Sequence, residues 1–572
     1  MTYQNLRVSI CISTVLLASA FAGSPTRAAD ELGTTLSPDL AKQATAYPNS
    51  GALKSVIVQL RDDTTDGTQL AEKLGGSFRR KLGLVRSVAL RVPYRALGAL
   101  ARNPAVQRVS PDRQVQMHCD LDEETMGVKY AWDTYQLDGT GVGVAILDTG
   151  SPATCPDVNR NCYGSMRGRV FADFVGTATT AYDDNGHGTH VAGCILGSGF
   201  WSGGVVSGAA GAARPIVLKV LDGAGSGSVS TVISALEWCI TKKATYNIRV
   251  INLSLGHTPG ESYVTDPLCA AVRRCVQAGI VVVCSAGNRG KDTAGTTRYG
   301  GIVSPGIEPA AITVGASDSR GTVARSDDRV CTFSSRGPTY IDQLVKPDLV
   351  APGNQIISVR SSGSQLDTNY AVNRIYPSQY GSTGTTPEYF KLSGTSMAAG
   401  HVSGIVALML EATPGLTPNT VKALLMYSAQ TLPLVDAQGV ALPSGVSRLT
   451  QGAGLVNAAG AVDLAEAVWP AAPVGTGWLA SPPAGQTTLN GFAFPWTAAV
   501  LHGSRVYYGN DLVSKNQVLW GDTVLWGDTV LWGDNSVQSD RTIWENQVLW
   551  GDTVLWGDSN GALSLYIQAH GD

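Results

Sequence analysis

The fold of most of this chain follows from one stretch, Val142-Gly143-Val144-Ala145-Ile146-Leu147-Asp148. Its first six residues are apolar without alternation, which is typical of a strand buried on both faces of a parallel sheet. Asp148 ends the run and should lie at the carboxyl edge of that sheet, where such proteins place functional side chains. Further strands are expected at 216–220, 250–253 and 312–315, and helices at 229–241 and 266–278. This alternation predicts an α/β domain with a doubly wound, mostly parallel sheet.

Three motifs place a carboxylate, an imidazole and a hydroxyl along the chain in that order. They are Ile146-Leu147-Asp148-Thr149-Gly150, His187-Gly188-Thr189-His190-Val191-Ala192-Gly193 and Ser393-Gly394-Thr395-Ser396-Met397-Ala398. Nucleophilic acyl transfer needs these groups: a serine to attack, a histidine to take its proton and an aspartate to hold the imidazole. The histidine and the serine each open a helical stretch, whose unpaired N–H groups suit an oxyanion. The motifs therefore predict a serine protease.

The same motifs resemble those of the subtilisin-like serine proteases, or subtilases, and the resemblance covers roughly residues 54–465. The order Asp, His, Ser is known for that family. The resemblance implies that Asp148 orients the imidazole, His187 is the general base and Ser396 is the nucleophile. It further implies an endopeptidase that forms an acyl-enzyme and is made as a self-processing precursor. One departure is Gly400, because the family usually has proline there.

Two further sites follow from the resemblance. The segment Val281-Val282-Val283-Cys284-Ser285-Ala286-Gly287-Asn288 resembles the family's oxyanion strand. It implies that the side-chain amide of Asn288 and the backbone N–H of Ser396 stabilise the tetrahedral intermediate. Two backbone segments resemble those that flank the first specificity pocket, which implies a substrate-binding role for Ser254, Leu255, Gly256, Ser285, Ala286 and Gly287.

Other functions fit the motifs less well. His187 and His190 lack the glutamate and the i, i+4 spacing of a metalloprotease helix, so His190 is expected to be structural. A lipase or esterase is disfavoured because Ala398 stands where the G-x-S-x-G motif needs glycine and because the order of the triad differs. The alternative from another class is a catalytically inactive, secreted binding or adhesion protein on a subtilase scaffold. The intact triad and Asn288 argue against it.

The N-terminus has the features of a targeting signal. Arg7 precedes an apolar run from Val8 to Ala22 that ends in alternating alanines, so residues 1–22 are expected to be a cleaved signal peptide, with Ala29 as the alternative cut. We therefore expect a secreted protein. No later run is long enough to span a membrane. The net charge of −3 gives no bias toward nucleic acid.

Domain boundaries follow from these motifs. A chain of 572 residues is too long for one core. Residues 54–116 have the pattern β-α-β-β-α-β, which resembles the inhibitory propeptide of subtilases and makes this ferredoxin-like segment an expected inhibitor of its own enzyme. A permanent regulatory domain is the alternative. Residues 120–467 are expected to form the peptidase domain, in which 361–391 looks like a long polar loop.

Secretion makes the cysteines candidates for disulfide bonds. Ten are present, and nine remain after Cys11 leaves with the signal. Cys155 and Cys162 bracket a polar loop and are the expected pair, whereas Cys284 in an apolar strand should be a buried thiol. No cofactor is expected for catalysis. Family members often bind structural calcium, but no loop is acidic enough to assign ligands to it.

The last hundred residues differ in composition. Four prolines suggest that 468–513 is a linker region. In residues 514–558 the hexapeptide Trp-Gly-Asp-Thr-Val-Leu then recurs, with repeat tryptophans at Trp520, Trp526, Trp532, Trp544, Trp550 and Trp556. An even period keeps these side chains on one face of extended chain, so a β-rich, solenoid-like coil is expected. The tryptophans either bind a surface or secretion partner or form the core of a structural tail.

Overall fold

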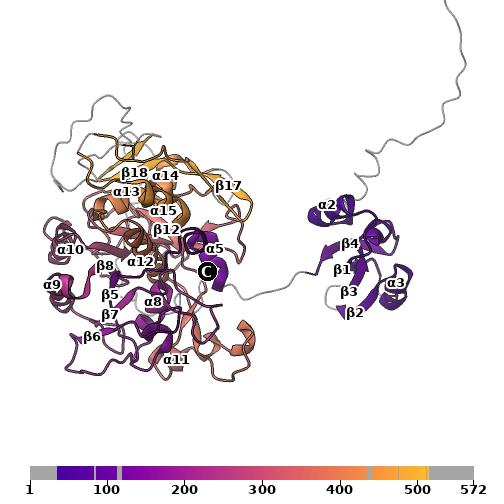
Figure 1. Cartoon of the computed structure of the whole chain (residues 1–572), viewed down its shortest axis with the longest axis horizontal. Coiled ribbons are helices and arrows are strands. Elements are labelled where there is room, and N and C mark those ends of the chain that lie inside the picture. Colours follow the sequence, from indigo (N-terminus) through magenta and orange to yellow (C-terminus); the bar gives the residue numbers. More distant parts are fainter. Residues whose placement is uncertain are drawn as a thin grey trace, which may run out of the picture. The chain divides into compact units, whose positions relative to one another are not determined.

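The computed structural model describes residues 35–62, 64–82, 86–112, 119–434, 441–473, 476–509 and 512–514. The expected signal peptide and the six repeat tryptophans lie outside the described residues. The chain divides into two compact units, Met1–Gln116 and Met117–Asp572 (Figure 1).

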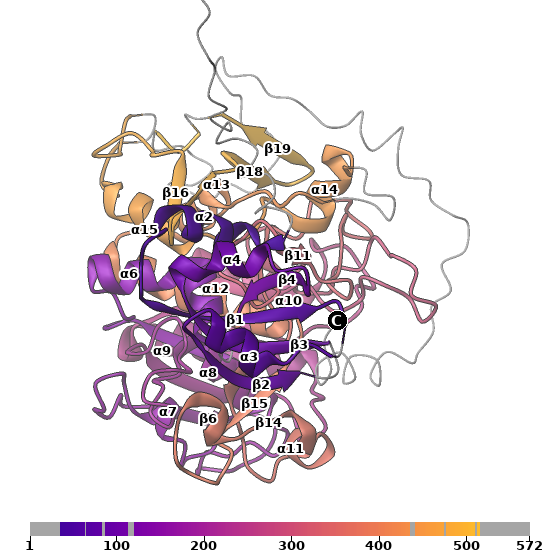
Figure 2. The ribbon, with the colours of Figure 1, turned by 90° about the vertical axis from the view of Figure 1, so that its right-hand side faces the viewer.

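The first unit is a four-stranded antiparallel sheet with helices packed against it (Figure 2). Its sheet order is β2-β3-β1-β4. Leu40, Leu70 and Leu97 from the helices share one core with Val56 and Val58, which alternate along the central strand. The elements are α2 (Pro38–Ala46), β1 (Leu53–Leu60), α3 (Gly67–Lys73), β2 (Ser77–Leu82), β3 (Ser87–Pro93), η2 (Tyr94–Ala96), α4 (Leu97–Ala101) and β4 (Val106–Pro111).

The second unit contains an eight-stranded sheet in the order β11-β10-β9-β8-β5-β7-β6, with β12 also paired to β10. All these pairings are parallel except that of β11. The strands are β5 (Gly143–Asp148), β6 (Val170–Asp173), β7 (Arg214–Lys219), β8 (Ile248–Leu253), β9 (Val281–Ser285), β10 (Ile312–Asp318), β11 (Arg329–Val330) and β12 (Leu349–Pro352). The prediction of an α/β fold with a mostly parallel sheet is confirmed.

Helices cover both faces of this sheet, as the unbroken apolar strands require. In β5, Val144 and Ile146 join the core formed with α8 (His187–Leu196) and α12 (Thr395–Ala412). Ala145 and Leu147 point the other way and join the core formed with α9 (Val229–Tyr246) and α10 (Pro267–Gln277). Figure 1 places α9 and α10 together at one side, with α8 and α12 nearer the centre.

The helix α12 is buried on almost every side. Every residue from Thr395 to Leu410 is buried. Among the described helices, it is also the one that is long and apolar enough to cross a membrane, but 89% of it is buried inside the protein. A helix that is apolar all round is typical of a protein core.

Smaller elements complete this unit. Residues 361–391 were expected to form a long loop, and this was wrong: Tyr389 and Ile375 are buried, and the segment contributes two strands of the sheet β13-β15-β14. Asp367 anchors the segment, because Arg360 and Arg374 both donate to its carboxylate. The elements are α5 (Cys119–Met126), α6 (Val128–Tyr135), α7 (Pro156–Asn159), β13 (Ile356–Val359), α11 (Gln365–Asn369), η3 (Ala371–Asn373), β14 (Arg374–Ile375), η4 (Pro377–Tyr380), β15 (Tyr389–Leu392), α13 (Pro418–Ser428), α14 (Ser444–Gln451) and α15 (Ala458–Ala467).

The region 468–513, expected to be a linker, is instead part of the folded unit. It forms two hairpins, β16 (Gln486–Leu489) with β17 (Phe492–Pro495), and β18 (Ala499–His502) with β19 (Arg505–Tyr508). Its tryptophans at 478 and 496 are buried in the core that also contains α12 and α15. Apolar burial of this kind holds a segment to its domain, so the prolines mark turns here and not a flexible connection.

The expected disulfide bond was also wrong. Cys155 is buried, Cys162 is exposed and both are free thiols. All eight cysteines whose side chains are described are free, and Cys284 is buried in β9 as expected. Burial raises the pKa of the Cys155 thiol to about 12.

Two tryptophans test whether 468–513 belongs to the folded unit. Trp496 is 6% exposed, donates to Thr487 at 2.8 Å and packs edge-on against Tyr427. Trp496→Ala should lower the free energy of unfolding by about 3–5 kcal/mol, because it removes a large buried aromatic side chain. Trp469 is 61% exposed, and Trp469→Ala should change this free energy by less than about 0.5 kcal/mol. Denaturant unfolding of the two variants measures the difference, and equal, small effects would show that the hairpins are loosely attached.

Candidate active site

The carboxyl edge of the sheet brings Asp148 and His187 together. Asp148 ends β5, and its Oδ1 lies 2.7 Å from the Nδ1 of His187, the first residue of α8. The backbone N–H of Thr149 donates to the same oxygen at 2.8 Å. Burial lowers the pKa of His187, but the charges of Asp148 and Asp183 and the hydrogen bond to Asp148 together raise it above its usual value. The pair can therefore orient an imidazole and stabilise its protonated form.

The turn before His187 is held by a second, buried aspartate. Asp183 accepts hydrogen bonds from the N–H groups of Asn185, Gly186 and Thr189. Its Oδ1 also accepts from the hydroxyl of Thr149, directly after Asp148. Asp183 thereby ties the start of α8 to the end of β5, so the distance between the imidazole and Asp148 does not depend on their own contact alone.

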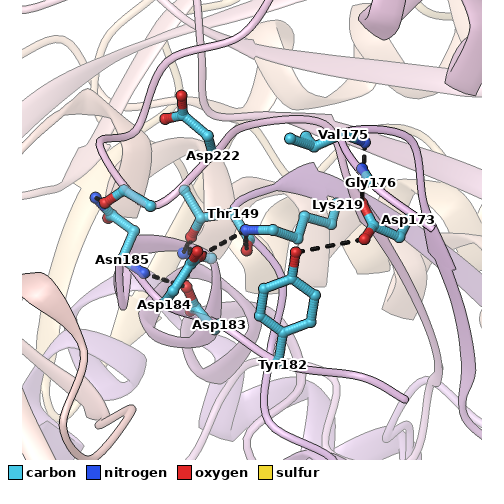
Figure 3. A network of polar contacts seen from close by, with 12 residues as sticks. Thr149, Asp173, Val175, Gly176, Tyr182, Asp183, Asp184, Asn185, Lys219 and Asp222 are labelled. Atoms are coloured by element: carbon cyan, nitrogen blue, oxygen red, sulfur yellow. Dashed lines mark hydrogen bonds and ion pairs between the residues drawn. The ribbon is translucent and has the colours of Figure 1, made fainter. Parts of the chain in front are cut away.

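A buried lysine reinforces this connection (Figure 3). Lys219 ends β7, lies in register with Asp148 and is 0% exposed. Its Nζ donates to the Thr149 carbonyl and to Asp184, each at 2.7 Å, and lies 4.6 Å from the centre of the Tyr182 ring. A buried ammonium needs such partners because it has lost its hydration. Lys219 therefore fixes the strand end and the loop before His187 to each other.

The nucleophile candidate lies at the start of the second core helix. Ser396 is the second residue of α12, and its hydroxyl donates to the Ser254 carbonyl at 3.3 Å. The Nε2 of His187 is buried and has no hydrogen-bond partner among the described residues. The structure thus has an acceptor nitrogen without a partner and a serine hydroxyl held by one weak, long bond. Such geometry is common in substrate-free enzymes, where catalytic hydrogen bonds form on substrate binding.

Asn288 is oriented by the residue before the serine. Its Oδ1 accepts from both the N–H and the hydroxyl of Thr395, each at 3.0 Å. This arrangement commits the carbonyl end of the side chain and leaves the Nδ2 donor for another group. The backbone N–H of Ser396 lies in the first turn of α12, where N–H groups have no partner within the helix. The two donors expected for an oxyanion site, Nδ2 of Asn288 and the backbone N–H of Ser396, are therefore connected through Thr395.

The expected substrate-binding segments follow β8 and β9. Ser254 donates from Oγ to the Ser396 carbonyl at 2.8 Å, and Asn252 in turn donates to Ser254. At Gly256 and Gly287 a Cβ atom would come within 2.5 and 2.8 Å of Val303, so both segments need glycine at these positions. Leu255 is partly buried, and Ser285 and Ala286 are buried at the end of β9. The structure places both segments at the same edge as the three motifs.

Four residues of this site were not found from the sequence: Asp183, Lys219, Asn252 and Thr395. The signal for Asp183 was present, because Asp two residues before Asn-Gly-His matches the spacing of an Asx turn. For Lys219 and Thr395 the chain has no local signal, since their partners lie far away in sequence. Asn252 donates to Ser254 two residues further on, but it also accepts from the distant Ser403, which no local pattern indicates.

Neither His190 nor the acidic side chains form a metal centre in the described part of the chain. His190 Nε2 lies 2.9 Å from the Phe390 carbonyl, and burial lowers the pKa of the imidazole to about 3. Within the described ranges, no group of three or more His, Cys, Asp or Glu side chains is placed to hold a metal ion. The buried carboxylate of Asp157 accepts from Phe200 N–H and from the Tyr389 hydroxyl, so protein donors surround it. These residues do not fit a calcium ion.

The sequence is similar to that of several known proteins. The sequence profile of the Subtilase family matches residues 139–460. The chain is 38% identical over 388 residues to the serine protease AprX of Bacillus subtilis (strain 168), which covers 65% of this chain and 81% of that protein. It is 33% identical over 357 residues to an extracellular serine proteinase of Thermus sp. (strain Rt41A), covering 60% and 71%.

The chain is also similar to two further proteins. Subtilisin E of Bacillus subtilis (strain 168) is 29% identical over 438 residues, covering 76% of this chain and 95% of subtilisin E. The crystal structure of a cold-adapted subtilisin-like serine proteinase is 31% identical, with 53% of this chain and 88% of that chain covered and a TM-score of 0.38. The profile spans more than half of the sequence, and the relatives are named proteases. This chain belongs to the subtilase family and is a serine endopeptidase.

Proposed function

We propose that the enzyme hydrolyses peptide bonds through Asp148, His187 and Ser396, and that it is a secreted protein that processes its own precursor. The observation that carries the assignment is the 2.7 Å contact between Asp148 and His187, whose other ring nitrogen is buried and has no hydrogen-bond partner among the residues that the structure describes. In this arrangement Nδ1 carries its proton toward Asp148, and Nε2 is the acceptor.

Hydrolysis then proceeds in two stages, acylation of Ser396 and hydrolysis of the acyl-enzyme. The hydroxyl of Ser396 leaves the Ser254 carbonyl, gives its proton to Nε2 of His187 and attacks the substrate carbonyl carbon. The carbonyl oxygen becomes negative and is stabilised by Nδ2 of Asn288 and the backbone N–H of Ser396. When the C–N bond breaks, His187 returns the proton to the leaving amine. Water repeats the sequence on the acyl-enzyme and frees Ser396.

The propeptide and the location are parts of the same proposal. Residues 54–116 belong to a unit of their own, separated from the second unit near Gln116. We expect cleavage between Asp112 and Glu124, at the boundary between the two units. Secretion is supported by the signal-like N-terminus and by the relative from Thermus, which is named an extracellular proteinase. Isolated residues 54–116, added back to the mature enzyme, should inhibit it.

Replacing the nucleophile tests the proposal directly. Ser396→Ala should abolish peptide hydrolysis and reaction with a serine-directed inhibitor, leaving only roughly the 10³–10⁴-fold acceleration over water that sites without a triad keep. The full-length precursor should accumulate, because the same hydroxyl would cut before the peptidase domain. Ser234→Ala, an exposed position on α9, is the control. Mass spectrometry and N-terminal sequencing follow processing, and normal processing by Ser396→Ala would contradict the assignment.

The pH dependence should report on His187. A general base must be neutral, so activity should rise with pH through the pKa of His187, with its midpoint above the usual histidine value of about 6.5. Asp148→Asn removes the charge that raises this pKa. The remaining activity should be much lower and its midpoint should move to lower pH. Profiles of kcat/KM from pH 4 to 10 measure both effects, and an unchanged midpoint in Asp148→Asn would contradict the assigned pair.

Asn288 should act on the transition state and not on substrate binding. Asn288→Leu should lower kcat by about 10²–10³-fold with little change in KM, a magnitude that was itself measured for such a donor in this family. Thr395→Val removes the hydroxyl that accompanies the backbone N–H at Oδ1, so it should have a smaller effect in the same direction. Steady-state kinetics on one peptide substrate compare the variants. A rise in KM at constant kcat would show that Asn288 binds substrate in its ground state.

A further inference from the structure

A second hollow lies on the peptidase domain, away from the residues assigned to catalysis. It has a volume of about 500 Å³ and lies between the end of α6, the loop at 161–164 and the loop that follows α8. We call it the aromatic pocket, because Trp132, Tyr163 and Phe200 line it. His187 begins α8 and Gly197 follows its last residue, so the length of the helix, about 15 Å, separates the pocket from the imidazole.

Large apolar side chains are exposed around this pocket. Tyr163 is 74% exposed, Phe200 is 47% exposed and the adjacent Trp201 is 37% exposed. Phe200 and Trp201 contact each other edge to face, and Arg160 lies over the Phe200 ring at 5.4 Å. Many glycines form the remaining wall, so backbone is open to a flat ligand. Clustered apolar exposure of this kind marks a binding surface, and the volume is within the range of ligand pockets.

A series of hydrogen bonds connects the last described residues to the pocket. Val513 is tied to Trp478, whose indole donates to the Val513 carbonyl at 2.7 Å. Trp478 lies beside the end of α15, because its carbonyl accepts from the N–H of Trp469. At the neighbouring end of α12, Glu411 accepts from the N–H of Asp138, a residue that lines the pocket. The Thr413 hydroxyl, directly after α12, donates to the Ala465 carbonyl in α15, so hydrogen bonds through the ends of these two helices connect the last described residues to the pocket lining.

We propose that the aromatic pocket binds the tryptophan side chains of the Trp-Gly-Asp repeats at 520–556 of the same chain. The reach is sufficient, since residues 515–572 in extended form can cover on the order of 100 Å or more. Indole is flat and apolar, and it packs edge-on or offset against aromatic rings such as those of Tyr163 and Phe200. The charge also fits: in 515–572 the only lysine and arginine are Lys515 and Arg541, whereas an aspartate follows most repeat tryptophans, and Arg160 lies over the Phe200 ring.

The pocket contains its own reporter. Cys162 lines it and is the exposed thiol among the eight cysteines whose side chains are described. If a repeat tryptophan fills the pocket, the thiol of Cys162 is shielded from alkylation. A tether supplies an effective concentration of about 1 mM, so even a Kd of about 0.1 mM for one repeat gives roughly tenfold protection. The full chain should therefore react about tenfold more slowly at Cys162 than a chain that ends at Ser514.

The experiment compares these two chains after both are blocked with a serine-directed inhibitor, so that neither cleaves the tail. Maleimide labelling of Cys162 is followed by peptide mass spectrometry. A synthetic peptide with the sequence of residues 517–534 should restore protection to the shortened chain. Phe200→Ala in the full chain should raise the labelling rate toward that of the shortened chain. Phe492→Ala removes another exposed phenylalanine, at 57%, in the hairpin β16–β17 and should leave the rate unchanged.

The other outcomes overturn the proposal in different ways. Equal labelling rates for the full and shortened chains would show that the repeats do not occupy the pocket. Protection that increases with protein concentration would mean that the repeats of a second copy fill it, and the intramolecular assignment would be wrong. If Phe492→Ala abolishes the protection of Cys162 as fully as Phe200→Ala does, the repeats do not bind in the aromatic pocket. Hydrolysis of a short peptide by a sample of the shortened chain taken before the inhibitor is added verifies that the chain is folded.

Discussion

The close packing of α8 against α12 is the constraint on which the rest of the site depends. Both helices begin at the carboxyl edge of the sheet, and each carries one member of the proposed triad in its first turn. Glycines allow this approach. A Cβ at Gly404 on α12 would come within 2.8 Å of the Ile195 carbonyl on α8. At Gly400, where the family usually has proline, a Cβ would meet that of Cys194 at 3.1 Å, so the side chains around this position leave little room for a ring.

Buried charges fix the loops that this packing does not reach. Lys219 and Asp183 hold the strand end and the turn on either side of Asp148 and His187. A similar cluster lies beside β10 and β12, where Asp348 pairs with Lys346 at 2.7 Å and with Lys422 at 3.0 Å. Burial lowers the pKa of Lys422 to about 7, although Asp348 opposes this shift. Removing one partner of such a cluster leaves a buried charge without compensation, which costs more than the intact pair contributes.

The sequence predicts the parts of this structure that depend on local pattern. The unbroken apolar strand at 142–147 and the glycine-bounded helix starts are local features, and both the sheet and the grouping of Asp148 with His187 follow from them. The hairpins at 468–513 were not predicted, because the prolines indicated a linker and the short turn signal between β16 and β17 was not used. Asn490-Gly491 connects β16 to β17 with positive φ at both residues, which is the turn that this dipeptide favours. The prediction of a polar loop at 361–391 was wrong for another reason. Hydrogen bonds from Arg360 and Arg374 to Asp367 hold this segment in place, and no apolar periodicity in the sequence indicates them.

Ser254 connects substrate binding to the position of the nucleophile. Its carbonyl accepts from the hydroxyl of Ser396, its own hydroxyl donates to the Ser396 carbonyl, and Asn252 donates to that hydroxyl. Ser403, two turns further along α12, donates to Asn252 from the other side. The first turns of α12 are therefore attached to the end of β8 at several atoms. Because we assign the segment that begins at Ser254 to substrate binding, a peptide that pairs with it contacts the same residue that holds the serine hydroxyl. Any shift of this segment on binding would move that hydroxyl relative to Nε2 of His187, so the strand couples occupancy of the cleft to the geometry of attack.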